Sequence, residues 1–116
     1  MVLVHGYGAG GGVFFRVIKD LSRFFHLYVI DMLGMGASGR PEFNGETTDM
    51  SENFFVDSLK KWKEKIGIQE KLYLAGHSLG GYVSSVYAMR YPEDLIQLVL
   101  LSPVGIPEKP DTFTHE

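Results

Sequence analysis

Residues 76–80 read Gly76-His77-Ser78-Leu79-Gly80, and this stretch decides the fold. It matches the pattern G-x-S-x-G and lies between an apolar run, residues 72–75, and a helical pattern that begins at Leu79. In that context the pattern is typical of a sharp strand-to-helix turn that exposes a serine hydroxyl. Glycine is required at both ends because a side chain there would collide with the neighbouring strand or helix. We therefore predict that Ser78 is a nucleophile. The plainer alternative is that Ser78 only caps the helix that follows it.

On both sides of this turn, apolar runs alternate with helical periodicity. Four apolar runs are predicted to be buried strands: residues 2–4, 27–30, 72–75 and 98–101. Three segments between them are predicted to be helices: residues 13–25, 51–66 and 79–91. The third helix carries small residues at Gly81, Ser84 and Ala88, which permit a close approach to a sheet. This alternation predicts an α/β fold, with a four-stranded parallel sheet that has helices on both faces.

Each of the first two helices is expected to bury one apolar face. In the first helix this face comprises Phe14, Val17, Ile18, Leu21 and Phe25, and in the second it comprises Phe55, Leu59, Trp62 and Ile66. The polar stretch at residues 40–49 is expected to be a surface loop. Residues 1–104 are expected to form a single domain, and residues 105–116 a tail.

The composition excludes several classes of function. The chain has 116 residues and a formal net charge of -3, and its 11 Lys and Arg residues are scattered, so we expect no nucleic-acid partner. There is no cysteine, which rules out disulfides, thiolate metal sites and cysteine nucleophiles. No apolar run is long enough to span a bilayer, and the N-terminus does not resemble a signal peptide. We expect neither a cofactor nor a metal.

A second motif, His5-Gly6-Tyr7-Gly8, follows the first predicted strand. A loop at this place can aim a backbone N–H at the nucleophile, and we predict that the N–H groups of Tyr7 and Leu79 form an oxyanion hole. His5 is expected to be buried and to hold the glycine loop by hydrogen bonds. His77 is expected to be structural and to point away from Ser78.

The third motif runs from Asp31 to Ser38 and ends the second strand with a glycine-rich turn of structural role. A rival interpretation fits this part of the chain. Gly6, Gly8 and Gly11 follow a strand with the spacing G-x-G-x-x-G, and Asp31 ends the next strand, as in a dinucleotide-binding domain. That interpretation leaves the turn around Ser78 unexplained and places the bulky Phe14 and Phe15 where the helix must approach the strand.

In this order the three motifs resemble the α/β-hydrolase fold family over nearly the whole chain. More narrowly, residues 7–10, 54–62, 76–82 and 102–111 resemble one lipid-handling subfamily. It contains lysophospholipases that deacylate N-acyl phospholipids, cardiolipin deacylase-like proteins, and a catalytically silent co-activator of a triglyceride lipase. In the silent branch asparagine replaces the nucleophile, whereas Ser78 is retained here. The resemblance makes the four strands numbers three to six of the family fold, in the spatial order four, three, five, six, so residues 1–104 would be a partial domain. Tyr7 and Ser78 would then meet at the point where the strand order reverses.

The resemblance implies a serine hydrolase of phospholipid or lysophospholipid esters that acts through an acyl-serine intermediate on a lipid or small ester. The segments that carry the family's acid and histidine have no counterpart in this sequence. His26 lies at the wrong end of the first helix, His115 lies in the tail, and Asp111 is given no role. We therefore expect this chain alone to be nearly inactive. Two further alternatives stay open: a non-catalytic lipase co-activator or lipid-binding regulator, and a lysophospholipid acyltransferase. The expected location is the cytoplasm, with contact to a membrane or lipid droplet, and mitochondria remain an alternative.

Overall fold

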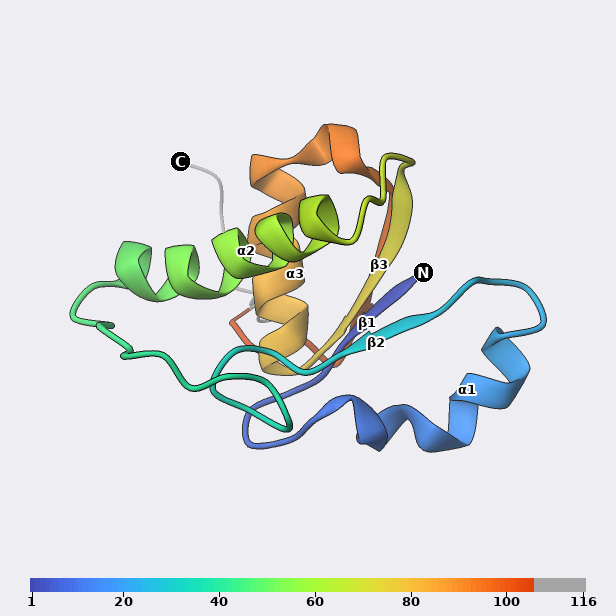
Figure 1. Cartoon of the computed structure of the whole chain (residues 1–116), viewed down its shortest axis with the longest axis horizontal. Coiled ribbons are helices and arrows are strands. Elements are labelled where there is room, and N and C mark those ends of the chain that lie inside the picture. The colour runs from blue at the N-terminus through green and yellow to red at the C-terminus, as the bar shows by residue number, and fades with distance from the viewer. Residues whose placement is uncertain (106–116) are drawn as a thin grey trace, which may run out of the picture.

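A parallel sheet lies at the centre of the computed structural model, which describes residues 1–105 (Figure 1). Its strands are β1 (Val2–Val4), β2 (Tyr28–Ile30), β3 (Leu72–His77) and β4 (Leu95–Leu101), and they pair in the order β2-β1-β3-β4. All three pairings are parallel. The predicted four-stranded parallel sheet and its strand order are confirmed. The strand order reverses between β1 and β3, so the loops that follow these two strands emerge side by side.

Helices cover both faces of the sheet, as predicted (Figure 1). The helices α2 (Thr48–Lys65) and α3 (Leu79–Arg90) lie on one face, where they share a core with Val2, Val4 and Leu74. The 3-10 turn η1 (Gly11–Phe14) and the helix α1 (Phe15–Leu21) lie on the other face, where Phe14 packs with Leu3 and Ala75. The side chains of β1 point alternately to the two faces, which is the period-2 pattern of a strand.

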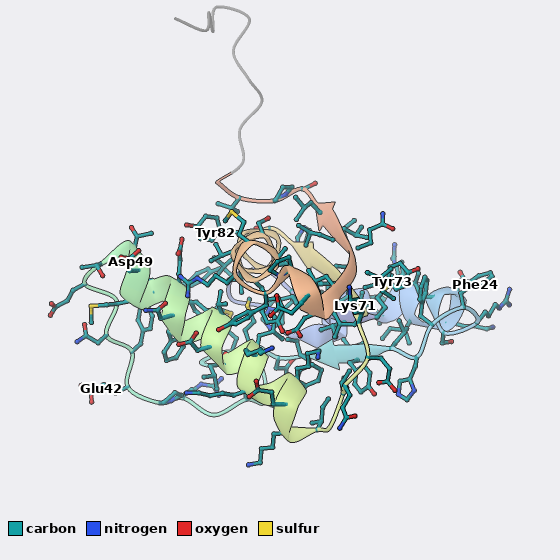
Figure 2. The ribbon with its side chains drawn as sticks, turned by 90° about the horizontal axis from the view of Figure 1, so that it is seen from above. Phe24, Glu42, Asp49, Lys71, Tyr73 and Tyr82 are labelled. Atoms are coloured by element: carbon teal, nitrogen blue, oxygen red, sulfur yellow. The ribbon has the colours of Figure 1, made fainter. Side chains whose placement is uncertain are left out.

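The first helix is shorter than the sequence predicted. It ends at Leu21 instead of residue 25, and the preceding turn is a 3-10 helix. The Ser22 hydroxyl donates to Lys19 O at 2.9 Å, a local hydrogen bond that competes with continuation of a helix. Val17, which was expected to be buried, is exposed. Phe24 follows the end of the helix and is 80% exposed; it lies at the opposite end of the molecule from Asp49 (Figure 2).

The second helix begins earlier than predicted, because Thr47 caps it. The Thr47 side chain accepts a hydrogen bond from Met50 N–H, which satisfies one of the free donors of the first turn. The buried stripe of α2 comprises Val56, Leu59 and Lys63, whereas Ile66 is exposed. The apolar face predicted for this helix is therefore correct only in part, and it includes a buried lysine that was not predicted.

This lysine belongs to an ionic cluster that joins α2 and α3 to the 3-10 turn η2 (Pro92–Asp94). Asp94 accepts hydrogen bonds from Lys60 Nζ at 2.8 Å and from Tyr87 Oη, and Lys63 Nζ lies 3.4 Å from its other oxygen. Burial alone would raise the pKa of Asp94, but the hydrogen bonds from Lys60 and Tyr87 outweigh it and lower the pKa. The cluster precedes β4, so it lies at the end of the sheet opposite Ser78 and is structural.

Within residues 1–105, no helix combines the length and the apolar character needed to cross a bilayer. The same residues contain no group of three or more His, Cys, Asp or Glu side chains placed to hold a metal ion.

Candidate active site

Ser78 occupies the sharp turn between β3 and α3 with φ 53° and ψ −119°, a strained backbone for a residue other than glycine. The sharp strand-to-helix turn predicted at this position is confirmed. A methyl group on Gly76 would lie 2.2 Å from Gly80 O, and one on Gly80 would lie 2.3 Å from Val4 O, so the turn leaves no room for side chains at either glycine. The Ser78 side chain makes no capping hydrogen bond to α3. The structure thus gives no support to a capping role.

The glycine loop after β1 lies against the Ser78 side chain. A methyl group on Gly6 would lie 3.1 Å from Ser78 Cβ and 3.5 Å from Ser78 Oγ. Given standard bond lengths, Tyr7 N is then within about 8 Å of Ser78 Oγ. Leu79 N belongs to the peptide that follows Ser78. Within residues 1–105, neither the Tyr7 nor the Leu79 N–H donates a hydrogen bond to another protein group. Two free donors therefore lie close to the serine.

His5 is completely buried and joins the glycine loop to the end of β2. Its Nε2 accepts from Met32 N–H at 3.0 Å, so the ring proton must lie on Nδ1, which donates to Gly6 O at 2.7 Å. Gly6 O also accepts from Ala9 N–H. In a trans peptide the N–H points opposite to the C=O, so these bonds orient Tyr7 N–H away from the His5 ring. His5 is thus a neutral histidine that holds the loop.

Within residues 1–105, no other histidine hydrogen-bonds to Ser78. His77 is exposed, and its Nδ1 lies 3.4 Å from the same methyl position on Gly6, so its ring is beside the loop and nearer to Ser78 than the sequence suggested. His26 stacks on Tyr28 at the start of β2, which is the far end of the parallel sheet from Ser78. His115 and Asp111 lie outside the described residues. No general base for Ser78 is identified within residues 1–105.

Asp31 holds the two glycine-rich turns together at the carboxyl ends of β1 and β2. Its Oδ1 accepts from Gly11 N–H at 2.6 Å and its Oδ2 from Ala37 N–H at 2.8 Å. The hydrogen bonds from Ala37 and Gly11 lower the pKa of Asp31. A methyl group on Gly36 would lie 2.3 Å from Oδ2, so this carboxylate is tightly enclosed. Both oxygens are engaged by the chain itself, which argues against the dinucleotide-binding alternative, where Asp31 would bind a ribose.

Of the two pockets considered for a substrate, the larger is not lined by Ser78. It has a volume of about 640 Å³ and follows the outer edge of β2, between Ile18 of α1 and Trp62 of α2. The smaller pocket, of about 80 Å³, lies between α2 and α3 and is lined by Phe55, Leu79 and Val83 among others. Because Leu79 directly follows Ser78, the smaller pocket offers apolar surface beside the candidate nucleophile.

Comparison with known proteins extends these observations. A family model described as the alpha/beta hydrolase fold matches residues 1–115. The chain is 38% identical over 116 residues to the 1-acylglycerol-3-phosphate O-acyltransferase ABHD5 of Rattus norvegicus, covering 100% of this chain and 32% of that protein. It is 42% identical over 105 residues to a probable 1-acylglycerol-3-phosphate O-acyltransferase of Oryza sativa subsp. japonica, covering 90% of this chain and 25% of that protein. The chain thus spans a third or less of the length of these relatives.

Solved structures show the same architecture. A serine hydrolase from Cycloclasticus zankles superposes with a TM-score of 0.82 at 28% identity, covering 94% of this chain and 39% of that one. A 2-hydroxy-6-oxo-6-phenylhexa-2,4-dienoate hydrolase from Rhodococcus sp. superposes with a TM-score of 0.80 at 30% identity, covering 94% and 40%. The similarity reaches across the sheet and the turn that holds Ser78.

Proposed function

Because the chain belongs to the α/β-hydrolase fold family, we propose that it carries the nucleophile and oxyanion hole of a lipid ester hydrolase. The observation that carries the proposal is the strained backbone of Ser78 at the turn between β3 and α3, with the glycine loop against its side chain. Strain at a residue other than glycine persists only where the surrounding structure imposes it, and such residues cluster at active sites.

In the proposed reaction Ser78 Oγ attacks the carbonyl carbon of the ester, and a general base takes the hydroxyl proton. The carbonyl oxygen becomes an oxyanion, which the N–H groups of Tyr7 and Leu79 stabilise. Loss of one such donor typically costs about 3–4 kcal/mol of transition-state stabilisation. The alcohol then leaves with a proton, and water attacks the acyl-serine to release the acid and restore Ser78.

Two observations favour a lipid ester as the substrate. The smaller pocket beside Leu79 offers apolar surface to an acyl chain. In addition, the relatives from rat and rice are named for acyl transfer to 1-acylglycerol-3-phosphate, a lipid. A lipid substrate would bring the protein to a membrane or lipid-droplet surface.

The names of these relatives favour a second candidate function, transfer of the acyl group to a lysophospholipid. The two reactions share the acyl-serine intermediate, which an alcohol can attack in place of water. Both candidates require Ser78, and they differ only in which molecule accepts the acyl group.

The experiment is covalent labelling of the chain with a fluorophosphonate probe, read by intact mass and by peptide mapping. Without a base Ser78 is a weak nucleophile, and removal of the base costs serine proteases about 10⁶ in turnover. We therefore expect slow labelling that imidazole, added as an external base, accelerates. The Ser78→Ala variant should not be labelled under either condition. Absence of labelling at Ser78 with imidazole present would refute the proposal and favour a non-catalytic regulator.

A second measurement separates the two acyl acceptors. A phospholipid with a labelled acyl chain is supplied with and without 1-acylglycerol-3-phosphate, and the labelled products are resolved by chromatography. Labelled free fatty acid as the sole labelled product would support hydrolysis. A labelled phosphatidic acid that appears only with the acceptor, and is lost in Ser78→Ala, supports acyl transfer.

A further inference from the structure

The last residue of β4 and the segment that follows it bind the two peptide groups that flank Ser78. Ser78 N–H donates to Leu101 O at 3.1 Å, and Ser78 O accepts from Val104 N–H at 3.1 Å. Ser78 O also accepts from the N–H groups of Gly81 and Tyr82 in the first turn of α3. These bonds fix the two peptide planes that define φ and ψ of Ser78.

The same bonds orient one donor of the proposed oxyanion hole. The peptide between Ser78 and Leu79 is trans, so Leu79 N–H points opposite to Ser78 O. Because Val104 N–H holds that oxygen together with the N–H groups of Gly81 and Tyr82, it contributes to the direction in which Leu79 N–H points. Ser78 and Val104 are 26 residues apart in the sequence, and they follow the ends of the neighbouring strands β3 and β4.

A second strained residue lies in this segment. Within residues 1–105, the residues other than glycine with positive φ are Ser78, at 53°, and Ser102, at 44°. Their strands are adjacent in the sheet. A strained turn is retained only where other contacts impose it. The turn at Ser102 leads the chain from the end of β4 to Val104, whose N–H binds Ser78 O.

Close packing holds the segment against α3. A methyl group on Gly81 would lie 2.8 Å from Pro103 Cβ, so Pro103 occupies the space that a side chain at Gly81 would need. Two residues further, Gly105 has φ 74°, and a methyl group there would lie 3.0 Å from the Tyr82 ring. The segment therefore touches the first turn of α3 on two sides.

We infer that residues 101–105, which we call the clasp, position Ser78 and the Leu79 N–H for the reaction. Val104 N–H and Pro103 act through the backbone of Ser78, so they are positioning groups that do not touch the substrate. The effect on reactivity depends on the proposed function, whereas the effect on the backbone of Ser78 does not.

The test compares Val104→Pro, which removes the N–H, with Val104→Ala, which keeps it and trims an exposed side chain. The first measurement is the NMR one-bond Hα–Cα coupling of Ser78, which distinguishes positive from negative φ. We expect the positive-φ value in the parent chain and in Val104→Ala, and its loss in Val104→Pro. The same coupling in both variants would overturn the inference.

The second measurement is the rate of fluorophosphonate labelling at Ser78 in imidazole buffer. Small misplacements of reacting groups can cost up to about a hundredfold in rate, so we expect Val104→Pro to be labelled at least about tenfold more slowly than Val104→Ala. Equal rates would overturn the positioning role. If the parent chain is not labelled at all, the proposed function fails, and the NMR comparison still decides whether the clasp holds the backbone.

A second pair of variants covers the case in which Val104→Pro does not fold. Gly81→Ala should displace Pro103, slow the labelling and alter the coupling of Ser78. Adding Pro103→Gly to Gly81→Ala removes the Cβ at 2.8 Å but leaves the Cα of residue 103 at 3.0 Å and Gly76 O at 3.2 Å, so we expect this double variant to recover part of the labelling rate. Failure of Pro103→Gly to restore the rate would show that Gly81 acts through some contact other than the clasp.

Discussion

Replacing Ser78 with glycine should make the fold more stable, although it removes the proposed nucleophile. A residue other than glycine at positive φ costs of order 1–3 kcal/mol, and Ser78 lies at φ 53° and ψ −119°. Glycine removes that strain, but its greater freedom in the unfolded chain costs roughly 0.5–1 kcal/mol. Alanine keeps the Cβ and therefore the strain. The difference should leave Ser78→Gly more stable than Ser78→Ala by about 0.5–2 kcal/mol.

The assay is urea unfolding followed by circular dichroism on the parent chain, Ser78→Ala and Ser78→Gly. Within residues 1–105 Ser78 Oγ makes no hydrogen bond, so Ser78→Ala should match the parent closely. A gain of 1 kcal/mol should raise Tm by about 4–8 °C in a domain of this size. Equal slopes of the three unfolding curves are the control for an unchanged denatured state. A glycine variant no more stable than the alanine variant would mean that the Ser78 backbone is relaxed, and the argument from strain would be refuted.

Three further predictions concern the loops that support the site. Replacing the buried His5 with alanine leaves Met32 N–H unpaired, removes one of the two hydrogen bonds to Gly6 O and opens a cavity, so it should cost about 2–5 kcal/mol in urea unfolding; a loss below 1 kcal/mol would contradict the hydrogen bonds described. Hydrogen bonds lower the pKa of Asp31 in the folded protein, so its ionised form stabilises the fold. This contribution is complete above the pKa of an unfolded aspartate, about 4, and is lost as the pH falls through the lower pKa of the folded state. The stability gap between the parent and Asp31→Asn should therefore narrow in acid, and a gap that is constant from pH 7 to pH 2 would disprove the assignment. Gly36→Ala combines positive φ with a contact of 2.3 Å to a carboxylate, so its melting temperature should fall further than that of Gly34→Ala, which has positive φ alone and open space around it.

The local features of the site could be predicted from the sequence. Gly76, Ser78 and Gly80 specify the turn because a side chain at either glycine would clash with a backbone atom of a neighbouring segment. The pattern lies within five residues, so it can be recognised in the sequence. The four apolar runs predicted the strands, because strands buried on both faces are apolar throughout. Their order in space came from the resemblance to a family and not from the residues themselves.

Other features were not predicted, in one case because they depend on residues far apart in the sequence and in two cases because a local hydrogen bond decided where a helix begins or ends. Lys63 can lie on the buried stripe of α2 because Asp94 lies opposite its ammonium group in the fold and Ile68 O accepts a hydrogen bond from it. The helix starting at Thr48 was predicted too late, although Thr47 is a capping residue type that could have indicated it. In α1 the periodicity continued beyond Leu21, but a local hydrogen bond of Ser22 replaced the next helical turn.

The sequence by itself determined the α/β alternation, the strained serine and the glycine loop that can face it, since these follow from residue types at short spacing. Only the tertiary structure decided what holds them in place. His5 takes its tautomer from Met32, and Ser78 takes its backbone anchors from Leu101 and Val104. The physical reason is that a backbone N–H or C=O carries no side-chain signature. Any residue can supply one, so the partner of such a group is set by the register of the strands and the packing of the loops, and not by the identity of the residue.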